Sequence, residues 1–124
     1  MNFKTLLFEK IDKIVKITIN RPENYNTLNN LMSHELLKAA IICDEEKESI
    51  RAVVLTGSGD KAFCAGGDLF SFKNSGENLS SEVKEFIVSF HGAISKFSRL
   101  NAPIIAAING VAAGTGLSLA SFPN

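Results

Sequence analysis

The sequence predicts a single α/β domain, and three observations support this class. Short segments in which apolar and polar residues alternate predict strands, whereas two long segments with apolar residues three and four positions apart predict helices. The chain has 124 residues, of which 45% are hydrophobic and 21% charged, as expected for one globular core. Thirteen basic residues balance thirteen acidic ones, so no overall charge points to nucleic acid or to an anionic membrane.

The first half of the chain predicts a β-hairpin, a helix and a third strand. Apolar residues alternate over residues 4–10 and 14–20, with a short polar turn between the two segments. Pro22 cannot donate to a strand ladder, so a polar loop follows before a helix over about residues 29–47. Residues 51–56, apolar at their centre, then predict a short buried strand.

The second half predicts a long helix, a strand and a helix of small residues. Residues 80–100 form the long helix, with Ser80 as a candidate N-cap. Its expected buried face consists of Val83, Ile87, Phe90, Ile94 and Phe97, with Phe86 beside them. Residues 104–108 predict a buried strand and residues 112–121 the last helix, so the order is β-β-α-β-loop-α-β-α.

Residues 104–122 carry no charge and are nearly long enough to cross a bilayer. Polar residues and three glycines interrupt this run, which favours a strand, a turn and a helix over a membrane span. We therefore expect no membrane association. Cys43 and Cys64 follow a polar N-terminus without a secretory signal, so we expect two free thiols and a cytoplasmic location.

The glycine-rich segment after the third strand first suggests nucleotide binding. Residues 57–62 satisfy the permissive G-x-G-x-x-A form of the dinucleotide fingerprint. Gly66 and Gly67 follow too soon for the helix that this fingerprint requires, which argues against a nucleotide site. A compact surface loop is the plainer alternative.

Two separate glycine segments share a design that suggests another chemistry. Residues 66–69 and residues 113–117 each lead into a predicted helical turn, where a backbone N–H is left unpaired. Two such donors can converge on one carbonyl oxygen and stabilise the oxyanion or enolate that forms there. The pair of segments therefore predicts a site for an activated carbonyl group.

Three ordered blocks give this prediction a family context. The run Asp60 to Leu69, the strand before it, and residues 103–116 resemble the enoyl-CoA hydratase/isomerase, or crotonase, superfamily, and so does the early block of residues 20–29. The resemblance covers almost the whole chain. It implies a crotonase-like (ClpP/crotonase) β-β-α spiral that is truncated here, with residues 1–124 as the N-terminal portion of an acyl-CoA-binding domain. The superfamily runs several reactions on one acyl-CoA site, so the resemblance names no single reaction.

The resemblance also assigns roles to individual residues. The backbone N–H groups of Gly67 and Thr115 would hold the thioester oxygen of an acyl-CoA, although glycine or alanine is expected where Thr115 stands. The adenine and pantetheine path would be lined by Ala65, Gly67, Asp68, Leu69 and Phe70. Asn24, Tyr25 and Thr27 would flank CoA, or they form an ordinary turn before a helix cap. Arg21 and Lys61 would meet the CoA phosphates, and Asp68 has capping of the next helical turn as its alternative role.

The catalytic acid is where the resemblance weakens. Hydratases of this family carry a glutamate three residues after the second oxyanion donor, and that position here is Ser118. A two-carboxylate hydratase is therefore disfavoured, and isomerase-like reactions become relatively better. His91 is a further candidate, because some aryl-CoA members use a histidine on this helix, but its alternative is a partly buried packing residue. We expect His34 to be exposed and Cys64 to be a packing residue rather than a nucleophile.

The sequence thus leaves two functional hypotheses. One is an acyl-CoA-binding enzyme of the enoyl-CoA hydratase/isomerase type, with an enolate stabilised by two backbone donors, no metal and no cofactor other than the CoA thioester as substrate. The resemblance implies a homo-oligomer, either a trimer or a hexamer. The other hypothesis is a catalytically inactive, truncated homologue that keeps CoA binding or only the assembly surfaces. In either case the apolar surfaces should make the chain associate.

Overall fold

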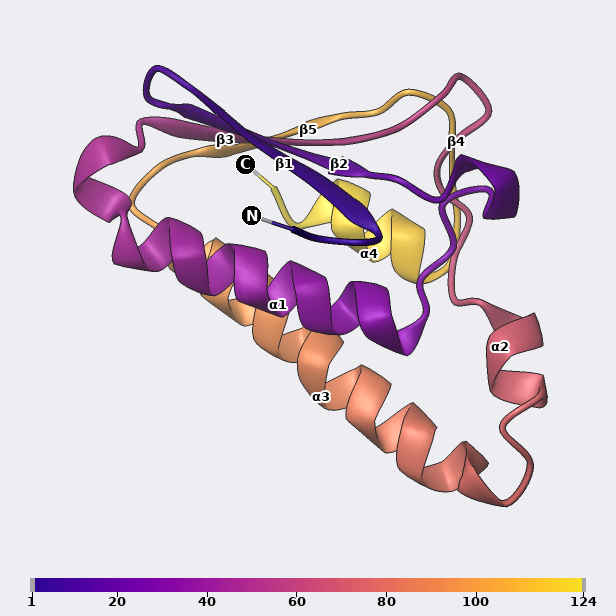
Figure 1. The fold of residues 1–124 in the computed structure, drawn as a ribbon. Helices are drawn as coiled ribbons and strands as arrows, with labels where there is room; N and C mark the ends of the chain where they lie inside the picture. Colours follow the sequence, from indigo (N-terminus) through magenta and orange to yellow (C-terminus); the bar gives the residue numbers. More distant parts are fainter. Residues whose placement is uncertain (1, 124) are drawn as a thin grey trace.

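Four strands form the larger sheet in the computed structural model, which describes residues 2–123. They are β1 (Leu6–Ile11), β2 (Ile14–Ile19), β3 (Ala52–Gly57) and β5 (Ile104–Ala107), in the spatial order β1-β2-β3-β5 (Figure 1). β1 and β2 pair antiparallel, whereas β2, β3 and β5 run parallel. The predicted hairpin and the two later strands are confirmed, with boundaries shifted by one or two residues.

The sheet buries one face and leaves the other open. On β2, Val15, Ile17 and Ile19 are fully buried, whereas Ile14 and Lys16, which alternate with them, are exposed. This follows from the strand period of two, because successive side chains point to opposite faces of a sheet. The buried face packs on helices, which lie below the sheet in Figure 1.

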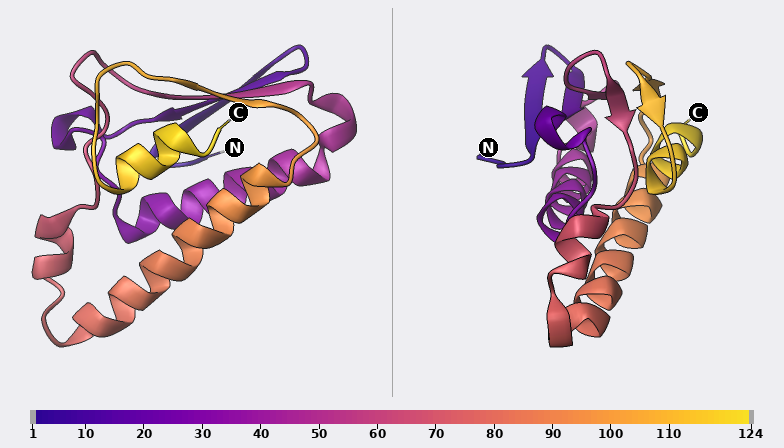
Figure 2. Two further views of the ribbon diagram at one scale, coloured as in Figure 1. Left: turned by 180° about the vertical axis from the view of Figure 1, so that it is seen from behind. Right: turned by 90° about the vertical axis from the view of Figure 1, so that its right-hand side faces the viewer.

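Two long helices, α1 (Asn30–Glu45) and α3 (Leu79–Ser98), run side by side under the buried face (Figure 2). Asn29 caps α1, since its side-chain oxygen accepts a hydrogen bond from the N–H of Met32 at 2.9 Å. The buried face of α3 consists of Phe86, Ser89, Phe90, Ala93 and Phe97. The prediction for this face is wrong at Ile87, which is 44% exposed, because packing on α1 turns the neighbouring Phe86 inward.

The start of α3 also differs from the prediction. A 3-10 turn, η3 (Gly76–Asn78), leads directly into the helix. The N-cap is Asn78 instead of Ser80, and its side chain makes no capping hydrogen bond. Ser80 lies inside the first turn of the helix, where its hydroxyl is exposed to solvent.

A second, smaller sheet was not predicted. β4 (Ala62–Cys64) pairs in parallel with β6 (Val111–Ala112). Its strands are short and lie inside glycine-rich segments, which the sequence pattern indicates as loops. Because residues 111 and 112 belong to β6, the predicted helix over 112–121 begins only at Thr115 and is α4 (Thr115–Ser121).

The remaining elements are short and connect the layers. They are η1 (Pro22–Asn24), η2 (Lys47–Ser49) and α2 (Leu69–Lys73). The uncharged run over residues 104–122 divides into β5, β6 and α4, as the glycines indicated. Within residues 2–123, none of the helices combines the length and apolar character that a membrane crossing requires.

The chain before β1 is tied to α1 by a buried carboxylate. Glu35 is 9% exposed and accepts hydrogen bonds from the backbone N–H groups of Lys4 and Thr5 at 2.8 and 2.7 Å, and from the Thr5 hydroxyl. Three donors offset the cost of burying the charge. Lys4 and Thr5 are therefore fixed against the helix layer.

Candidate functional site

The two glycine segments that the sequence singled out lie against each other. β4 pairs with β6, and the N–H of Ala113 donates to the carbonyl oxygen of Cys64 at 3.1 Å. A Cβ atom on Gly66 would lie 3.3 Å from the carbonyl oxygen of Ala113, and one on Gly114 would lie 3.6 Å from the Cα of Gly66. The residues just before both candidate donors therefore approach each other so closely that added methyl groups would contact the other segment.

Each candidate donor follows a glycine in the left-handed region. Gly66 has a φ of 118° and Gly114 a φ of 57°. These backbone angles favour glycine and turn the chain sharply before Gly67 and Thr115. Neither the Gly67 N–H nor the Thr115 N–H has a hydrogen-bond acceptor among residues 2–123, so both groups can bind a ligand oxygen.

Gly116 holds α4 unusually close to β4. A Cβ atom at this position would lie 1.9 Å from the carbonyl oxygen of Cys64 and 2.9 Å from its Cβ. No side chain fits in that space, so only glycine allows the helix to approach the strand at this distance. The contact fixes Thr115 relative to the segment that carries Gly67.

The early polar loop lies beside the segment that carries Gly67 and is bonded to it. The N–H of Leu28 donates to the carbonyl of Gly66 at 2.8 Å, and the N–H of Asp68 donates back to Leu28 at 2.7 Å. The N–H of Ala65 donates to the carbonyl of Tyr25 at 3.1 Å. Residues 25–28 thus run alongside residues 65–68, with Tyr25 beside Ala65 and Leu28 beside the candidate donor Gly67.

Within this loop the three CoA-flanking candidates differ in their surroundings. Asn24 ends η1 and is exposed, and Tyr25 is 55% exposed in a left-handed conformation, with a φ of 54°. Thr27 is half-buried, and both its carbonyl and its hydroxyl accept from the Arg21 guanidinium. The turn expected as an alternative is present, and its exposed residues remain able to contact a ligand.

Two asparagines that the sequence reasoning missed hold the glycine loop. Asn26 is 1% exposed, and its amide nitrogen donates to the carbonyls of Ser58 and Ala62 at 3.0 and 2.8 Å. The Asn109 amide nitrogen donates to the carbonyls of Gly59 and Ala62 at 2.9 and 3.0 Å. These bonds hold residues 58–61, which lie between β3 and β4 and belong to neither strand. The only sequence signal at Asn26 is that asparagine tolerates its φ of 55°.

Arg21 and Asp68 form an ion pair across the candidate site. Arg21 Nη2 lies 2.9 Å from Asp68 Oδ2, with the two side chains 14% and 13% exposed. Asp68 Oδ1 also accepts from the N–H of Ser71 at 3.1 Å and so caps α2. The capping role expected for Asp68 is confirmed. The same guanidinium also donates to Thr27, and the expectation that Arg21 meets a CoA phosphate stays a prediction.

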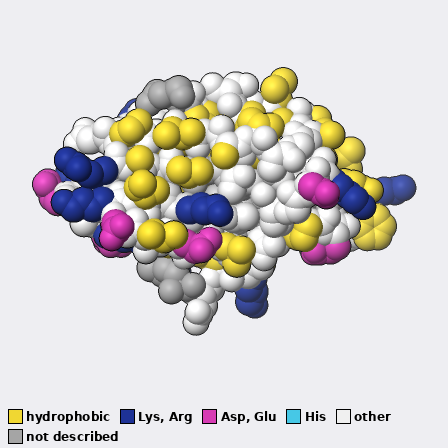
Figure 3. All heavy atoms as spheres, turned by 90° about the horizontal axis from the view of Figure 1, so that it is seen from above, with side chains coloured by type: hydrophobic (Ala, Val, Ile, Leu, Met, Phe, Trp, Pro, Cys, Tyr) yellow, Lys and Arg dark blue, Asp and Glu magenta, His cyan; other side chains and the backbone are white. Residues whose placement is uncertain are grey.

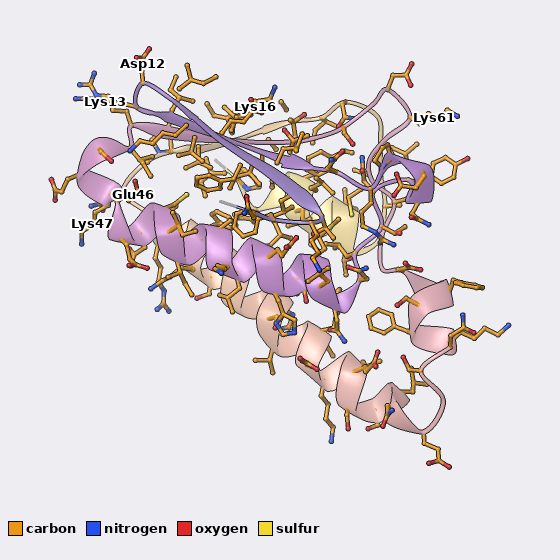
Figure 4. All side chains as sticks on the ribbon, in the orientation of Figure 1. Asp12, Lys13, Lys16, Glu46, Lys47 and Lys61 are labelled. Atoms are coloured by element: carbon orange, nitrogen blue, oxygen red, sulfur yellow. The ribbon has the colours of Figure 1, made fainter. Side chains whose placement is uncertain are left out.

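An open hollow of about 300 Å³ lies between the first loop and the glycine loop. Its lining consists of Pro22, Glu23, Tyr25, Asn26 and residues 58–62. Lys61 is exposed at this hollow and is labelled at the upper right of Figure 4. Residues 57–62 lead into β4 and form no helix, which contradicts the dinucleotide fingerprint.

Beyond Gly67, the chain presents two apolar side chains to solvent. Leu69 and Phe70, at the start of α2, are 79% and 76% exposed. Phe72 of the same helix instead packs edge-on against Phe86 of α3, with ring centroids 5.3 Å apart. Ala65, also assigned to the ligand path, is half-buried. The path residues on α2 are therefore accessible.

The side chains on α4 supply hydroxyl groups and no carboxylate. Ser118 is exposed one turn after Thr115. The Thr115 hydroxyl oxygen is buried and has no hydrogen-bond partner among residues 2–123. In the interior of a helix, a threonine hydroxyl can bond to a carbonyl of the preceding turn. Thr115 is the first helical residue, so no helical turn precedes it.

The two histidines lie on the helix layer. His91 is exposed, with its ring centroid 6.2 Å from that of Phe90, so the alternative of a partly buried packing residue is wrong. His34 is exposed as expected, and its two ring nitrogens lie 2.7 Å from Glu85 Oε1 and 2.9 Å from Ser89 Oγ. These contacts join α1 to α3.

Both cysteines are free and buried. Burial raises the pKa of the Cys43 thiol to about 12 and also raises the pKa of the Cys64 thiol. A thiol that resists ionisation is a poor nucleophile, in agreement with the packing role expected for Cys64. Within the part of the chain that the structure describes, no three His, Cys, Asp or Glu side chains are placed to hold a metal ion.

Comparison of the sequence with known proteins identifies relatives of this chain. A model of the enoyl-CoA hydratase/isomerase family matches residues 9–123. A probable enoyl-CoA hydratase of Rhodobacter capsulatus is 38% identical over 120 residues, which make up 97% of this chain and 44% of that protein. A crotonyl-CoA hydratase of Syntrophomonas wolfei is 34% identical over 121 residues, or 97% of this chain and 45% of that protein.

A solved structure agrees with these sequence relatives. The crystal structure of an enoyl-CoA hydratase from Bacillus anthracis matches with a TM-score of 0.86 and 33% sequence identity, and the match covers 98% of this chain and 46% of that chain. The chain therefore spans a little less than half the length of the relatives it matches.

Proposed function

Because the chain belongs to the enoyl-CoA hydratase/isomerase family and has its crotonase-like α/β fold, we propose that it binds an acyl-CoA thioester. In this proposal the backbone N–H groups of Gly67 and Thr115 donate to the thioester oxygen. The observation that carries the proposal is the pair of unpartnered N–H groups on two segments in contact, each placed after a glycine with positive φ.

Two such donors favour chemistry at the carbon next to the carbonyl. When that carbon loses a proton, negative charge moves onto the thioester oxygen, where the two N–H groups stabilise it. Backbone donors are held by the fold and need no reorganisation as the charge develops. The close approach of α4 to β4 at Gly116 supports this rigidity.

The remaining ligand contacts are proposed from the surroundings of these donors. Tyr25 and Asn24 are exposed beside the 65–68 segment, and Leu69 and Phe70 offer apolar surface to the pantetheine or the acyl chain. Lys61 lines the open hollow and would meet a CoA phosphate there, together with Arg21, which also pairs with Asp68.

The side chains available for proton transfer favour isomerisation over hydration by two carboxylates. Ser118 stands on α4 where hydratases of the family carry a glutamate, and the Asp68 carboxylate is engaged by Arg21 and by the N–H of Ser71. A hydroxyl does not act as a base at neutral pH. We therefore propose that any proton shuttle comes from a group other than the Ser118 hydroxyl.

Binding of acetoacetyl-CoA, measured by isothermal titration calorimetry, tests the two donors. Thr115→Pro removes one N–H at the first helical position, where proline is well tolerated. The residue before a proline prefers an extended conformation, and Gly114, with φ 57° and ψ −128°, has the mirror image of that conformation. Because glycine has no Cβ atom, the two mirror images are equivalent for it, so we expect the start of α4 to survive the substitution. We expect affinity about tenfold weaker than for Thr115→Ala, which keeps the N–H. Equal affinities would contradict the donor role, and no heat from the wild-type chain would contradict acyl-CoA binding.

A second candidate function is binding without catalysis, which Ser118 specifically favours. For the 124-residue chain alone we expect little or no turnover of crotonyl-CoA or of a 3-enoyl-CoA. Binding of acetoacetyl-CoA together with isomerisation of the 3-enoyl-CoA would support the enzyme, whereas binding without any turnover would support the inactive homologue.

A further inference from the structure

An aromatic side chain lies directly beside the candidate donor Gly67. A Cβ atom on Gly67 would lie 3.9 Å from Cε2 of Phe72, an ordinary van der Waals distance. Phe72 belongs to α2, and its ring is half-buried. We propose that this ring limits the length of the acyl group, so that the chain prefers short acyl-CoA thioesters. This inference rests on the proposed function, because it concerns the acyl-CoA site.

The Phe72 ring is the outermost of three aromatic rings that pack on one another. Its centroid lies 5.3 Å from that of Phe86, with the two planes at 79°, and the Phe86 ring stacks on that of Phe90 at 5.7 Å and 5°. Phe86 and Phe90 are only 7% and 4% exposed and belong to the hydrophobic core. Because protein cores are close-packed, the rings behind Phe72 resist its displacement by a ligand.

The backbone that carries the Phe72 ring is restrained at both ends of α2. At the start of this helix, Asp68 is the N-cap residue and pairs with Arg21 at 2.9 Å. Just beyond the end of the helix, the Ser75 hydroxyl donates to Glu82 Oε2 on α3 at 2.7 Å. Moving the ring together with its helix would therefore break contacts on either side of it.

The acyl group has to occupy the inner side of Gly67. The carbonyl carbon of a thioester carries the acyl group on one side and the sulfur of pantetheine on the other. Pantetheine leads to the charged CoA nucleotide, which stays in solvent because burying its charges is costly. Leu69 and Phe70 are exposed on this outer side. With the thioester oxygen at the Gly67 N–H, the acyl chain is directed away from solvent and towards Phe72.

The surface at this end of the molecule suits the outer part of such a ligand. In Figure 1, α2 lies at the right-hand end of the molecule. Figure 3, seen from above, shows hydrophobic and basic side chains near one another at the same end. Apolar side chains can contact the pantetheine arm and basic ones the phosphates, which leaves the buried rings for the acyl group.

Calorimetric titration with butyryl-CoA and octanoyl-CoA tests the limit. These saturated ligands differ only in the length of the acyl chain, so the ratio of their dissociation constants is unaffected by a general loss of CoA affinity. We expect the wild-type chain to bind octanoyl-CoA about tenfold or more weakly than butyryl-CoA, because methylene groups that a closed pocket does not fit reduce affinity. In Phe72→Ala, the space left by the ring accepts the longer chain. The preference should then reverse, with octanoyl-CoA bound about tenfold more tightly than butyryl-CoA.

Phe72→Leu and Phe8→Ala complete the comparison. Leucine keeps an apolar side chain on Phe86 and opens less space, so the gain for octanoyl-CoA should have the same direction and a smaller size. Phe8 is a half-buried ring on β1 that packs on Phe3, with centroids 6.0 Å apart, outside the candidate site. Phe8→Ala should therefore keep the wild-type ratio. Circular dichroism checks that each variant is folded, and the leucine variant decides if the alanine variant does not fold.

The outcomes separate this inference from the proposed function. A wild-type chain that binds acetoacetyl-CoA without preferring butyryl-CoA to octanoyl-CoA overturns the acyl limit alone. A folded Phe72→Leu chain with the wild-type ratio, or a reversed ratio in Phe8→Ala, overturns the role of Phe72. Failure of the wild-type chain to bind any of these acyl-CoA thioesters contradicts the proposed function, and the acyl limit with it.

Discussion

Thr115 joins two unsatisfied groups at one position. Its N–H is free to bind a ligand, and its buried hydroxyl oxygen has no partner among residues 2–123. A buried polar atom without a hydrogen bond costs about 1–3 kcal/mol. Nearby, the side-chain amides of Asn26 and Asn109 use all their polar atoms in hydrogen bonds: those of Asn109 bond to the glycine loop and the residues flanking it, and those of Asn26 to the glycine loop and to the N–H of Arg21. Thr115 thus has an unpaired N–H and an unpaired hydroxyl at the point where a ligand carbonyl is proposed to bind.

Replacing Thr115 with valine should stabilise the protein. Thr115→Val removes the unpartnered hydroxyl, keeps the branched shape and leaves the backbone N–H in place. We expect the free energy of unfolding, measured by urea denaturation, to rise by about 1 kcal/mol. Thr115→Ser, which retains the hydroxyl, is the control and should show no gain. A valine variant that is less stable than the wild type would indicate that the hydroxyl is satisfied in solution.

The buried thiol of Cys43 should make stability depend on alkaline pH. Burial raises the pKa of this thiol to about 12 in the folded chain, above its value of about 8.5 in an unfolded chain. The folded state then holds its proton where the unfolded state loses it, so stability that is present below about pH 8.5 is lost as the pH rises towards 12.

We expect this loss to reach about 1.4 kcal/mol per pH unit relative to Cys43→Val, which has no thiol to ionise. Urea denaturation of both proteins at pH 8, 9 and 10 provides the comparison. Parallel stability curves over this range would show that Cys43 ionises as easily in the folded chain as in the unfolded one.

Elements of the large sheet could be predicted from the sequence, whereas those of the small sheet could not. Alternation over five or six residues identified β1 and β2, and an apolar run identified β3 and β5. β4 and β6 have only three and two residues, too few for a period to be visible. Which face of α3 is buried depends on packing against α1, because Phe86 and Ile87 both fit helical spacing in the sequence.

At the candidate site, the glycine segments could be predicted from the sequence, whereas the side chains that hold these segments in place could not. Gly66, Gly67 and Gly114 indicate unusual backbone geometry through their residue type alone. Asn26, in contrast, bonds to carbonyls 32 and 36 residues away, and a sequence pattern contains no such pairing. The Arg21–Asp68 ion pair joins residues that are 47 positions apart, so the sequence pattern does not contain it either.

The packing of α4 on β4 should depend on Gly116. In Gly116→Ala, the new methyl group would meet the backbone of Cys64, and backbone cannot rotate away as a side chain can. We expect the free energy of unfolding to fall by about 3 kcal/mol or more. Gly92→Ala is the matched control, since its methyl group would lie 3.4 Å from Leu37 Cδ1, a flexible side-chain atom.

The control should be neutral or stabilising, because alanine favours a helix interior by about 1 kcal/mol over glycine. Urea denaturation of both variants gives the comparison. Similar stabilities for the two variants would mean that α4 can shift away from the strand without cost.

At the scale of the whole molecule, the helices cover one face of the large sheet and the candidate site lies at the end where the small sheet joins it (Figures 1 and 2). The free donors, the first loop and α2 all meet there. A ligand bound at this junction, as proposed, would contact segments from both sheets, so binding should stabilise the fold as a unit.

Acetoacetyl-CoA should therefore raise the free energy of unfolding. A ligand at a concentration about 100 times its dissociation constant should raise the free energy of unfolding by about 2.7 kcal/mol. A thermal melt series over ligand concentration measures the effect, and Thr115→Pro should need about ten times more ligand for the same increase. A melting temperature that is independent of ligand concentration would contradict binding at this junction.

The strand order has a consequence for the time course of folding. In both sheets the order in space follows the order along the chain, β1-β2-β3-β5 in one and β4-β6 in the other. Each new strand therefore adds to an edge that already exists and never inserts between two earlier strands. As the chain leaves the ribosome, β1 and β2 can pair first and β3 and β5 can join in turn. Protease protection of ribosome-bound chains of increasing length should rise in steps that match these additions.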